Sequence, residues 1–195
     1  MSTAPTLLTQ AEVRLVDSWL EGASSDALLH TLEASIPWTQ HHIRLFGRSV
    51  ASPRLSCWIG DPGMAYAYSG ARFEPHPWPG ALAALRDAVS DAAGVRFNSV
   101  LANLYRDGRD GMGWHSDDEP ELGPQPVIAS VSLGATRRFA FKHRTRPGVG
   151  LTLPLTAGSL LVMAGDTQRH YRHAVPKTTR PVGPRINLTF RTILG

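Results

Sequence analysis

The seven residues Arg185-Ile-Asn-Leu-Thr-Phe-Arg191 alternate polar and apolar side chains near the end of the chain. A period of two is typical of a β-strand that places one face in a hydrophobic layer. Similar short segments, rich in branched and aromatic residues and punctuated by Gly and Pro, are 100–105, 127–133, 139–141, 151–155 and 159–163. Because these strands are closely spaced without intervening helices, they predict an antiparallel sandwich or jelly roll.

Helices are expected in the first half of the chain. Thr9-Gln-Ala-Glu12 has the form of a capping box, and apolar residues at helical spacing follow it as far as Leu20. Similar signals predict helices from about residue 24 to 36 and from 79 to 94, with strand and loop in 39–62. We therefore predict an α+β fold that is mainly β, with N-terminal helices packed on a jelly-roll core, a double-stranded β-helix.

Composition argues for a globular protein in a reducing compartment. Hydrophobic residues make up 42% of the 195 residues and charged residues 18%. No run of about 18 apolar residues could span a membrane, and no basic region followed by an apolar run marks a secretory signal. The single cysteine, Cys57, cannot form an internal disulfide, which favours a cytoplasmic location.

The net charge of +4 is concentrated in the C-terminal part of the chain. Residues 137–195 contain eleven Lys or Arg and one acid, Asp166, which is a local balance of +10. Such a balance favours a polyanionic partner, nucleic acid first. The alternative is that these cations only solvate the exposed faces of strands.

His115-Ser-Asp117 places an imidazole and a carboxylate two residues apart. In an extended segment, residues i and i+2 point to the same face, so both side chains can reach one metal ion. With one distant His they form the ligand set of an Fe(II) oxygenase, which leaves three positions open for O₂ and an organic co-substrate. The candidates for that His are His170, His173 and, further away, His143. Alternatively, the pair lies in a solvated turn and binds no metal.

Two arginines indicate the chemistry of the co-substrate. Arg185 and Arg191 lie six residues apart, on one face of the predicted strand. A guanidinium fork matches a carboxylate in geometry, so the co-substrate is expected to carry carboxylates. The alternative is an edge strand with exposed arginines.

Five blocks of sequence occur here in one order. They are Asn103-Leu-Tyr105, Gly113-Trp-His-Ser-Asp-Asp-Glu119, Ile128-Ala-Ser-Val-Ser-Leu-Gly134 with Arg138-Phe139, His173-Ala-Val-Pro176 and Arg185-Ile-Asn-Leu-Thr-Phe-Arg191. In order and spacing they resemble the AlkB family of Fe(II)/2-oxoglutarate dioxygenases, which repair alkylated bases. The resemblance extends from about Leu45 to Ile193 and is nearest to the members that act on double-stranded DNA.

This resemblance implies a role for each matched residue. His115, Asp117 and His173 would bind Fe(II) and form the catalytic centre. The contacts to 2-oxoglutarate would be Asn103, Tyr105, Arg185, Asn187, Thr189 and Arg191, with Arg185 at the distal carboxylate and Arg191 at the keto-acid end. With O₂, the enzyme would demethylate bases such as 1-methyladenine and 3-methylcytosine in DNA, with RNA as a further candidate, and release formaldehyde, succinate and CO₂.

Recognition of the base is assigned to an N-terminal segment and to the loop after His115. The methylated base must be flipped out of a duplex into a pocket. Tyr66 and Tyr68 match a segment that supplies an aromatic wall, followed by Ser69, although either tyrosine could be core instead. Asp118 matches an acidic residue that reads the exocyclic amine of the base, and Glu119 is expected to support the loop.

Leu45-Phe46-Gly47-Arg48 matches a hairpin that some relatives push into duplex DNA. An exposed Phe46 could fill the gap left by a flipped base, whereas a buried Phe46 would be ordinary core. Arg48 and Arg54 are expected near phosphates. The cations expected to hold the nucleic-acid backbone are Arg137, Arg138, Lys142, Arg144 and Arg146.

Residues 1–195 are expected to form one dioxygenase domain, with helices and the nucleotide-recognition segment in 1–97 and the catalytic jelly roll in 98–195. We expect a monomer that binds nucleic acid and not a membrane. One alternative is an oxygenase of the same fold that acts on tRNA or protein. Another is a jelly-roll binding module whose His-Asp pair is inert.

Overall fold

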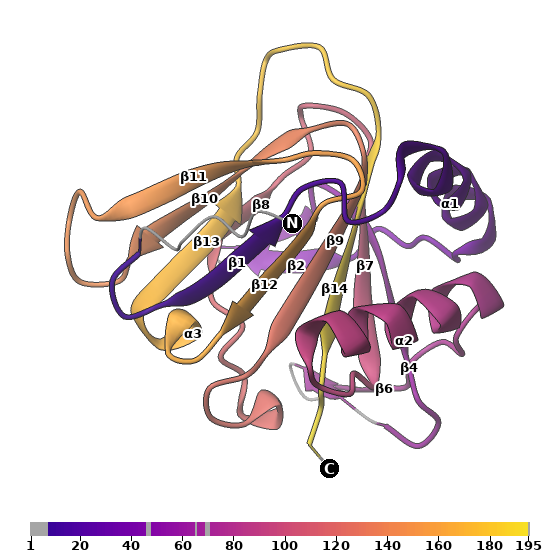
Figure 1. The fold of residues 1–195 in the computed structure, drawn as a ribbon, viewed down its shortest axis with the longest axis horizontal. Coiled ribbons are helices and arrows are strands. Elements are labelled where there is room, and N and C mark those ends of the chain that lie inside the picture. Colours follow the sequence, from indigo (N-terminus) through magenta and orange to yellow (C-terminus); the bar gives the residue numbers. More distant parts are fainter. Residues whose placement is uncertain (1–7, 46–47, 65, 69–70, 195) are drawn as a thin grey trace.

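Two antiparallel β-sheets form the body of the protein, and helices cover the outer face of the larger sheet (Figure 1). This computed structural model describes residues 8–45, 48–64, 66–68 and 71–194. The larger sheet has the strand order β1 (Glu12–Val16), β12 (Leu160–Ala164), β9 (Ile128–Gly134), β14 (Arg185–Arg191), β7 (Ser99–Tyr105) and β4 (Leu55–Gly60). The smaller sheet has the order β11 (Gly150–Leu155), β10 (Arg137–His143), β13 (Tyr171–Val175) and β8 (Met112–His115). This arrangement confirms the predicted jelly-roll core.

The remaining elements lie around these two sheets. They are the hairpins β2 (His42–Leu45)–β3 (Arg48–Ala51) and β5 (Tyr66–Tyr68)–β6 (Ala71–Phe73), the helices α1 (Gly22–Ser35), α2 (Gly80–Ala93) and α3 (Thr167–His170), and a 3-10 turn at Pro120–Leu122. The helices predicted near 24–36 and 79–94 are confirmed as α1 and α2. Gly94 ends α2 in the left-handed region, with φ 73°, as its C-cap position requires. None of the described helices is long and apolar enough to cross a membrane.

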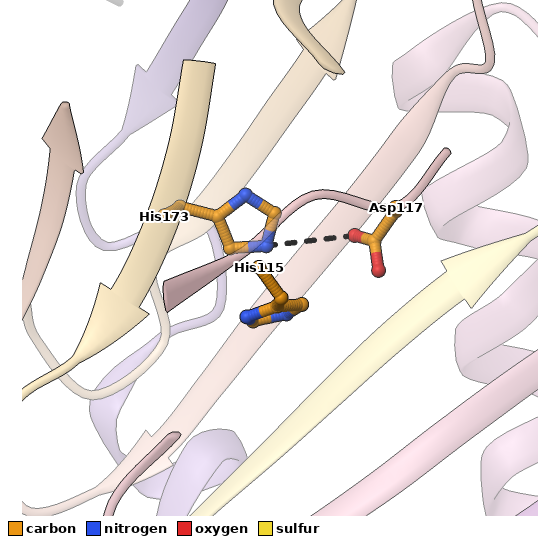
Figure 2. Close-up of side chains that lie close together, drawn as sticks. All are labelled: His115, Asp117 and His173. Carbon is orange, nitrogen blue, oxygen red and sulfur yellow. Dashed lines mark ion pairs between the residues drawn. The ribbon is translucent and has the colours of Figure 1, made fainter. Parts of the chain in front are cut away.

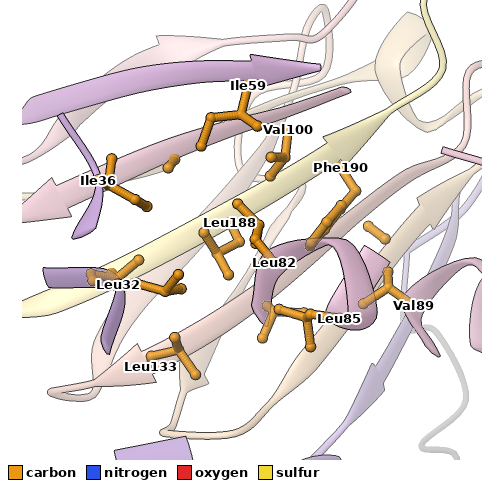
Figure 3. Packing of buried hydrophobic residues seen from close by; sticks show 14 of the residues in the cluster. Leu32, Ile36, Ile59, Leu82, Leu85, Val89, Val100, Leu133, Leu188 and Phe190 are labelled. Carbon is orange, nitrogen blue, oxygen red and sulfur yellow. The ribbon is translucent and has the colours of Figure 1, made fainter. Parts of the chain in front are cut away.

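Strand β14 shows how the alternation of side chains divides the interior. Ile186, Leu188 and Phe190 are fully buried in the cluster beneath α1 and α2. Figure 3 shows Leu188 and Phe190 in this cluster. The intervening Asn187 and Thr189 are buried as well, but they line a pocket between the sheets. Successive residues of a strand point to opposite faces, so one strand supplies both the hydrophobic core and the polar interior.

The predicted helix after Thr9 is wrong, because residues 12–16 form strand β1 at the edge of the larger sheet. Val13 and Leu15 both pack into the cluster between the sheets, at a spacing of two rather than three or four. The backbone N–H of Glu12, which a capping box would use, donates instead to Thr167 Oγ1 at 2.9 Å. Residues 12–16 therefore form a strand and not a helix, because pairing with five residues of β12 outweighs the local helical pattern.

Replacing Leu188 by alanine tests the helix-side core. Leu188 is 0% exposed beneath the helices, so the cavity should lower the free energy of unfolding by about 2–5 kcal/mol. The matched control is Leu194→Ala, at a leucine that is 54% exposed, which should cost less than about 1 kcal/mol. Urea unfolding followed by circular dichroism measures both, and equal losses in the two variants would contradict this packing.

Candidate active site

His115, Asp117 and His173 come together between the two sheets (Figure 2). One potential ligand atom from each lies within 4.8 Å of the others. His115 and His173 are paired in register on β8 and β13, and their ring centroids are 4.2 Å apart. Asp117 lies beyond the end of β8 in an irregular segment, so the expected strand geometry holds for His115 but not for the carboxylate.

The two other candidate histidines lie away from this cluster. His143 and His170 stack on each other with ring centroids 5.9 Å apart. His143 Nδ1 accepts the backbone N–H groups of Thr145 and Arg146, both at 3.1 Å, and so caps the turn after β10. His170 ends the short helix α3 rather than lying in a strand with His173.

The hydrogen bonds and charges around the cluster favour a metal-binding state. Nδ1 of His115 lies 2.9 Å from the carbonyl of Gly113, so donation from this atom leaves the Nε2 lone pair free. Burial lowers the pKa of His173 to about 3, against the opposing effect of Asp117, and therefore keeps this imidazole neutral. Burial, the largest single effect, would raise the pKa of Asp117, but Arg191 and the imidazoles of His173 and His115 together outweigh it, so the pKa is lowered and the carboxylate is ionised.

The oxygen atoms of Asp117 are used differently. Oδ1 accepts a 2.6 Å hydrogen bond from Arg191 Nη2. Oδ2 is buried, lies 3.6 Å from His173 Nε2 and has no hydrogen-bond donor among the described residues. A buried carboxylate oxygen left without a donor is costly unless a cation is bound there. Two imidazoles and one carboxylate are a fitting ligand set for Fe(II).

Residues that the sequence argument missed hold the Asp117 loop in place. The backbone N–H of Asp117 donates to Oε1 of the buried Gln168 at 3.0 Å. Ser116 Oγ donates to the carbonyl of Tyr171 at 2.8 Å. Gln168 is 51 positions away from Asp117, and no local pattern in the sequence marks this pairing.

A pocket opens beside the three side chains and lies between the sheets. Its lining combines the cluster with inward residues from strands of both sheets: Leu101, Asn103, Tyr105, Met112, His115, Asp117, Ser130, Phe139, Met163, His173, Val175, Asn187, Thr189 and Arg191. Five of the six predicted co-substrate contacts therefore meet here. Their role in binding 2-oxoglutarate remains a prediction.

Arg185, the sixth predicted contact, is a buried cation beside this lining. It is 1% exposed, and its guanidinium carbon lies 5.3 Å from the centre of the Tyr105 ring. Nη2 donates to Ser132 Oγ at 2.9 Å, whereas Nε and Nη1 have no acceptor among the described residues. Burial lowers the pKa of Arg185 to about 10, which still leaves it charged near neutral pH. A buried guanidinium with two unused donors fits a carboxylate ligand.

The amides in the pocket are already oriented by neighbouring side chains. Asn187 Nδ2 donates to Ser130 Oγ at 2.7 Å, and Asn103 Oδ1 accepts from Arg54 Nε at 2.8 Å. Arg54 is partly buried and donates through Nε to this pocket wall, and its expected contact with a phosphate stays a prediction. Ser130 and Ser132 of β9 accept hydrogen bonds from Asn187 and Arg185. The sequence argument gave these two serines no role, although they lie in the matched block 128–134.

The predicted substrate residues fall into two groups. Phe46, Gly47 and Ser69 lie outside the described residues. Tyr66 and Tyr68 lie on β5, but their side chains are also outside the described part. The wedge and the aromatic wall thus stay predictions. Among the predicted substrate residues of the N-terminal segment, only Arg48, which is exposed on β3, has a described side chain.

Two acids follow Asp117 and have different surroundings. Asp118 is half-exposed and pairs with Arg144 Nη2 at 2.7 Å. Burial raises the pKa of Glu119, whose Oε2 has no donor among the described residues. Asp118 thus has an ionic partner, and Glu119 has an unused acceptor.

Arg137 does not lie at the surface as expected. It is 3% exposed and donates to the carbonyls of Asp107, Asp110 and Pro176 at 2.8 to 3.1 Å. It therefore fastens the loop before β8 to the end of β13, and the expectation that it holds a nucleic-acid backbone is wrong.

Replacing Gln168 by leucine should weaken metal binding about 10- to 100-fold, because the Asp117 loop loses its side-chain acceptor. Anaerobic titration with Fe(II) or Co(II) measures the affinity, and thermal unfolding checks that the variant is folded. The control is Gln40→Leu, since Gln40 is exposed and donates only to the carbonyl of Ser52. Unchanged affinity in a folded Gln168→Leu protein would rule out this positioning role.

Comparison with known proteins assigns the chain to a family. The sequence pattern of the 2OG-Fe(II) oxygenase superfamily matches residues 12–191. The chain is 38% identical to human alpha-ketoglutarate-dependent dioxygenase alkB homolog 3 over 202 residues, covering 99% of this chain and 69% of that protein. It is 40% identical to human DNA oxidative demethylase ALKBH2 over 182 residues, covering 88% and 70%. The solved structure of OsALKBH1 shares the fold, with a TM-score of 0.69 and 17% identity over 96% of this chain and 100% of that one. The chain therefore belongs to the 2OG-Fe(II) oxygenase superfamily and, within it, to the AlkB family, and it uses Fe(II), 2-oxoglutarate and O₂.

Proposed function

We propose that this protein removes methyl groups oxidatively from base nitrogens of DNA, with RNA as a further substrate, and releases formaldehyde, succinate and CO₂. One observation carries the proposal. The chain is 40% identical to human DNA oxidative demethylase ALKBH2 across 88% of its length. The His115-Asp117-His173 cluster, in which Asp117 and His173 are buried, is consistent with it. The lesions that suit this chemistry are of the 1-methyladenine and 3-methylcytosine type.

His115, Asp117 and His173 are the proposed iron ligands. Bound Fe(II) and 2-oxoglutarate would supply the oxidation of the methyl carbon by O₂. The protein holds the ligands ready: Gly113 orients the His115 ring, and Arg191 takes one oxygen of Asp117 and leaves the other facing His173. Phe139 stacks against His173 with centroids 5.2 Å apart and fills space beside the ring.

The proposed 2-oxoglutarate contacts combine charge with oriented amides. Arg185 offers two unused donors to the distal carboxylate, beside Tyr105 and Asn103. Arg191 has an unpartnered Nε next to the Asp117 carboxylate, which suits the keto-acid end near the metal. Asn187 and Thr189 lie between these two ends on the same strand face.

The proposed base-recognition residues come from an N-terminal segment and from the loop after His115. Phe46, Gly47, Arg48, Tyr66, Tyr68 and Ser69 stay in the proposal through the family resemblance. Asp118 and Glu119 are both candidates for reading an exocyclic amine, because a carboxylate is an acceptor. Because Oε2 of Glu119 is buried without a donor among the described residues, we favour base reading by Glu119 over its expected role as support for the loop. A single-domain, monomeric, cytoplasmic enzyme, with residues 98–195 as its catalytic part, completes the proposal.

The test is 2-oxoglutarate turnover, followed as succinate formed, with three candidate substrates offered in parallel. Oligonucleotides bearing 1-methyladenine or 3-methylcytosine, single-stranded and duplex, should stimulate turnover and yield formaldehyde in equal amount. Methylated tRNA and a methylated peptide represent the alternative substrates. His115→Ala should abolish stimulation in every arm. Stimulation by peptide or tRNA alone would reject DNA demethylation and leave the oxygenase assignment intact.

Replacing Arg185 by methionine separates co-substrate binding from folding. Removing an unpaired buried charge should leave the stability of the ligand-free protein unchanged or higher. The thermal shift caused by 2-oxoglutarate, measured anaerobically with Mn(II), should need at least about tenfold more co-substrate, since charge-assisted bonds of about 1.5–3 kcal/mol are lost. Arg96→Met, at an exposed arginine, is the control. A normal response of Arg185→Met to 2-oxoglutarate would contradict the assignment.

A further inference from the structure

The outer face of the smaller sheet is basic. On β10, the inward residues Phe139 and Phe141 pack between the sheets, so the alternate residues Arg138 and Lys142 point outward, and both are exposed. On β13, Arg172 is exposed between the buried Tyr171 and His173. Strands β8, β10, β11 and β13 contain no Asp or Glu.

Two of these cations face each other directly. Lys142 and Arg172 are Cα partners in the β10–β13 ladder. Like charges directly opposite on adjacent strands repel and lower stability. Among the described residues, neither cation lies within 4.0 Å of a carboxylate, and Asp118, the acid that pairs with a cation of this region, is held by Arg144 at 2.7 Å. An anion bound between Lys142 and Arg172 would remove the repulsion.

An exposed tryptophan lies next to these charges. Trp114 is 44% exposed, and the Lys142 ammonium lies 4.3 Å from the centre of its ring. This cation–π contact holds the lysine on the sheet surface. Two residues from Lys142 on β10 and from Arg172 on β13, the side chains are small: Ala140 and Ala174 are Cα partners and are 9% and 4% exposed.

This face lies behind the two strands that carry His115 and His173, and it ends at the edge strand β8. Trp114 immediately precedes the ligand His115, and Arg172 immediately precedes the ligand His173. Because successive residues of a strand point to opposite faces, each ligand inside the sandwich has a neighbour on the outer surface. A polymer whose reacting group enters the site can therefore extend over the edge strand β8 onto Trp114, Arg172 and Lys142.

We propose that this outer face, made of Trp114, Arg138, Lys142 and Arg172, binds the phosphodiester backbone of the nucleic-acid strand that carries the target base. The proposal rests on the proposed function. Cations without carboxylate partners fit a chain of regularly spaced phosphates, and an exposed aromatic ring beside them can contact a base. An acidic protein would match the charges but gives no reason for the exposed indole.

The experiment measures binding of a fluorescein-labelled, unmodified 15-mer DNA by anisotropy at several salt concentrations. The slope of the logarithm of the binding constant against the logarithm of salt concentration is negative. Lys142→Gln and Arg172→Gln should each reduce its magnitude by about one, and the double variant by about two. The double variant should bind at least about tenfold more weakly at 0.1 M salt. The free energy of unfolding of the double variant without DNA should not fall, because a like-charge pair is removed. Arg96→Gln, at an exposed cation beyond the end of α2, should behave as wild type.

A second measurement connects this surface with catalysis. The ratio of kcat/KM for a methylated 15-mer to that for a methylated trinucleotide should fall at least about tenfold in the double variant, because the trinucleotide is too short to reach the face. An unchanged salt slope and an unchanged ratio would overturn the proposal. Competition by poly-glutamate as strong as that by DNA would also overturn it, in favour of an acidic protein partner. Wild-type DNA binding without turnover of any lesion would reject the proposed function, and the salt slopes of the variants would still test the surface.

Discussion

The alternation of side chains along β14 is the constraint on which the rest of the structure depends. Its even-numbered residues fill the core beneath α1 and α2, and its odd-numbered residues carry the polar wall of the pocket. A register shift of one residue would place Arg185 and Arg191 in the hydrophobic core and move Leu188 into the pocket. Pairing with β7 on one side and β9 on the other excludes such a shift. Core stability and the geometry of the site are therefore specified by the same backbone hydrogen bonds.

The interior between the sheets holds several polar groups that the protein alone does not satisfy. Asp117 Oδ2 and two donors of Arg185 are buried without partners among the described residues. Such groups destabilise a folded chain, and their concentration at one place indicates that ligands of opposite charge complete the site. A cation at Asp117 and a carboxylate at Arg185 would each remove one of these costs. The chemistry expected of an Fe(II)/2-oxoglutarate enzyme and the electrostatics of this chain thus agree.

The N-terminal segment shows why a local signal can mislead. Residues 9–20 carry a capping box and apolar residues at helical spacing, yet 12–16 join the larger sheet. The sequence Glu-Val-Arg-Leu-Val is compatible with both periods over such a short length, and its β-branched residues suit a strand. The exposed edge of β12 offered backbone partners to β1, and this contact joins residues about 150 positions apart. Long strands with clear alternation, by contrast, were predictable because their pattern is local.

The sequence by itself determined the jelly-roll class, the two main helices, the His115–Asp117 pair and the arginines of β14, since each follows from a short-range period or spacing. It left three histidines open as the third ligand until a family resemblance favoured His173. Only the tertiary structure brought His173 beside His115, stacked His143 on His170, buried Arg137 and put Gln168 against the Asp117 backbone. These outcomes depend on which strands pair and on which side chains meet across large sequence separations. No local pattern encodes them, because the free energy that selects them comes from packing and hydrogen bonds formed only in the folded chain.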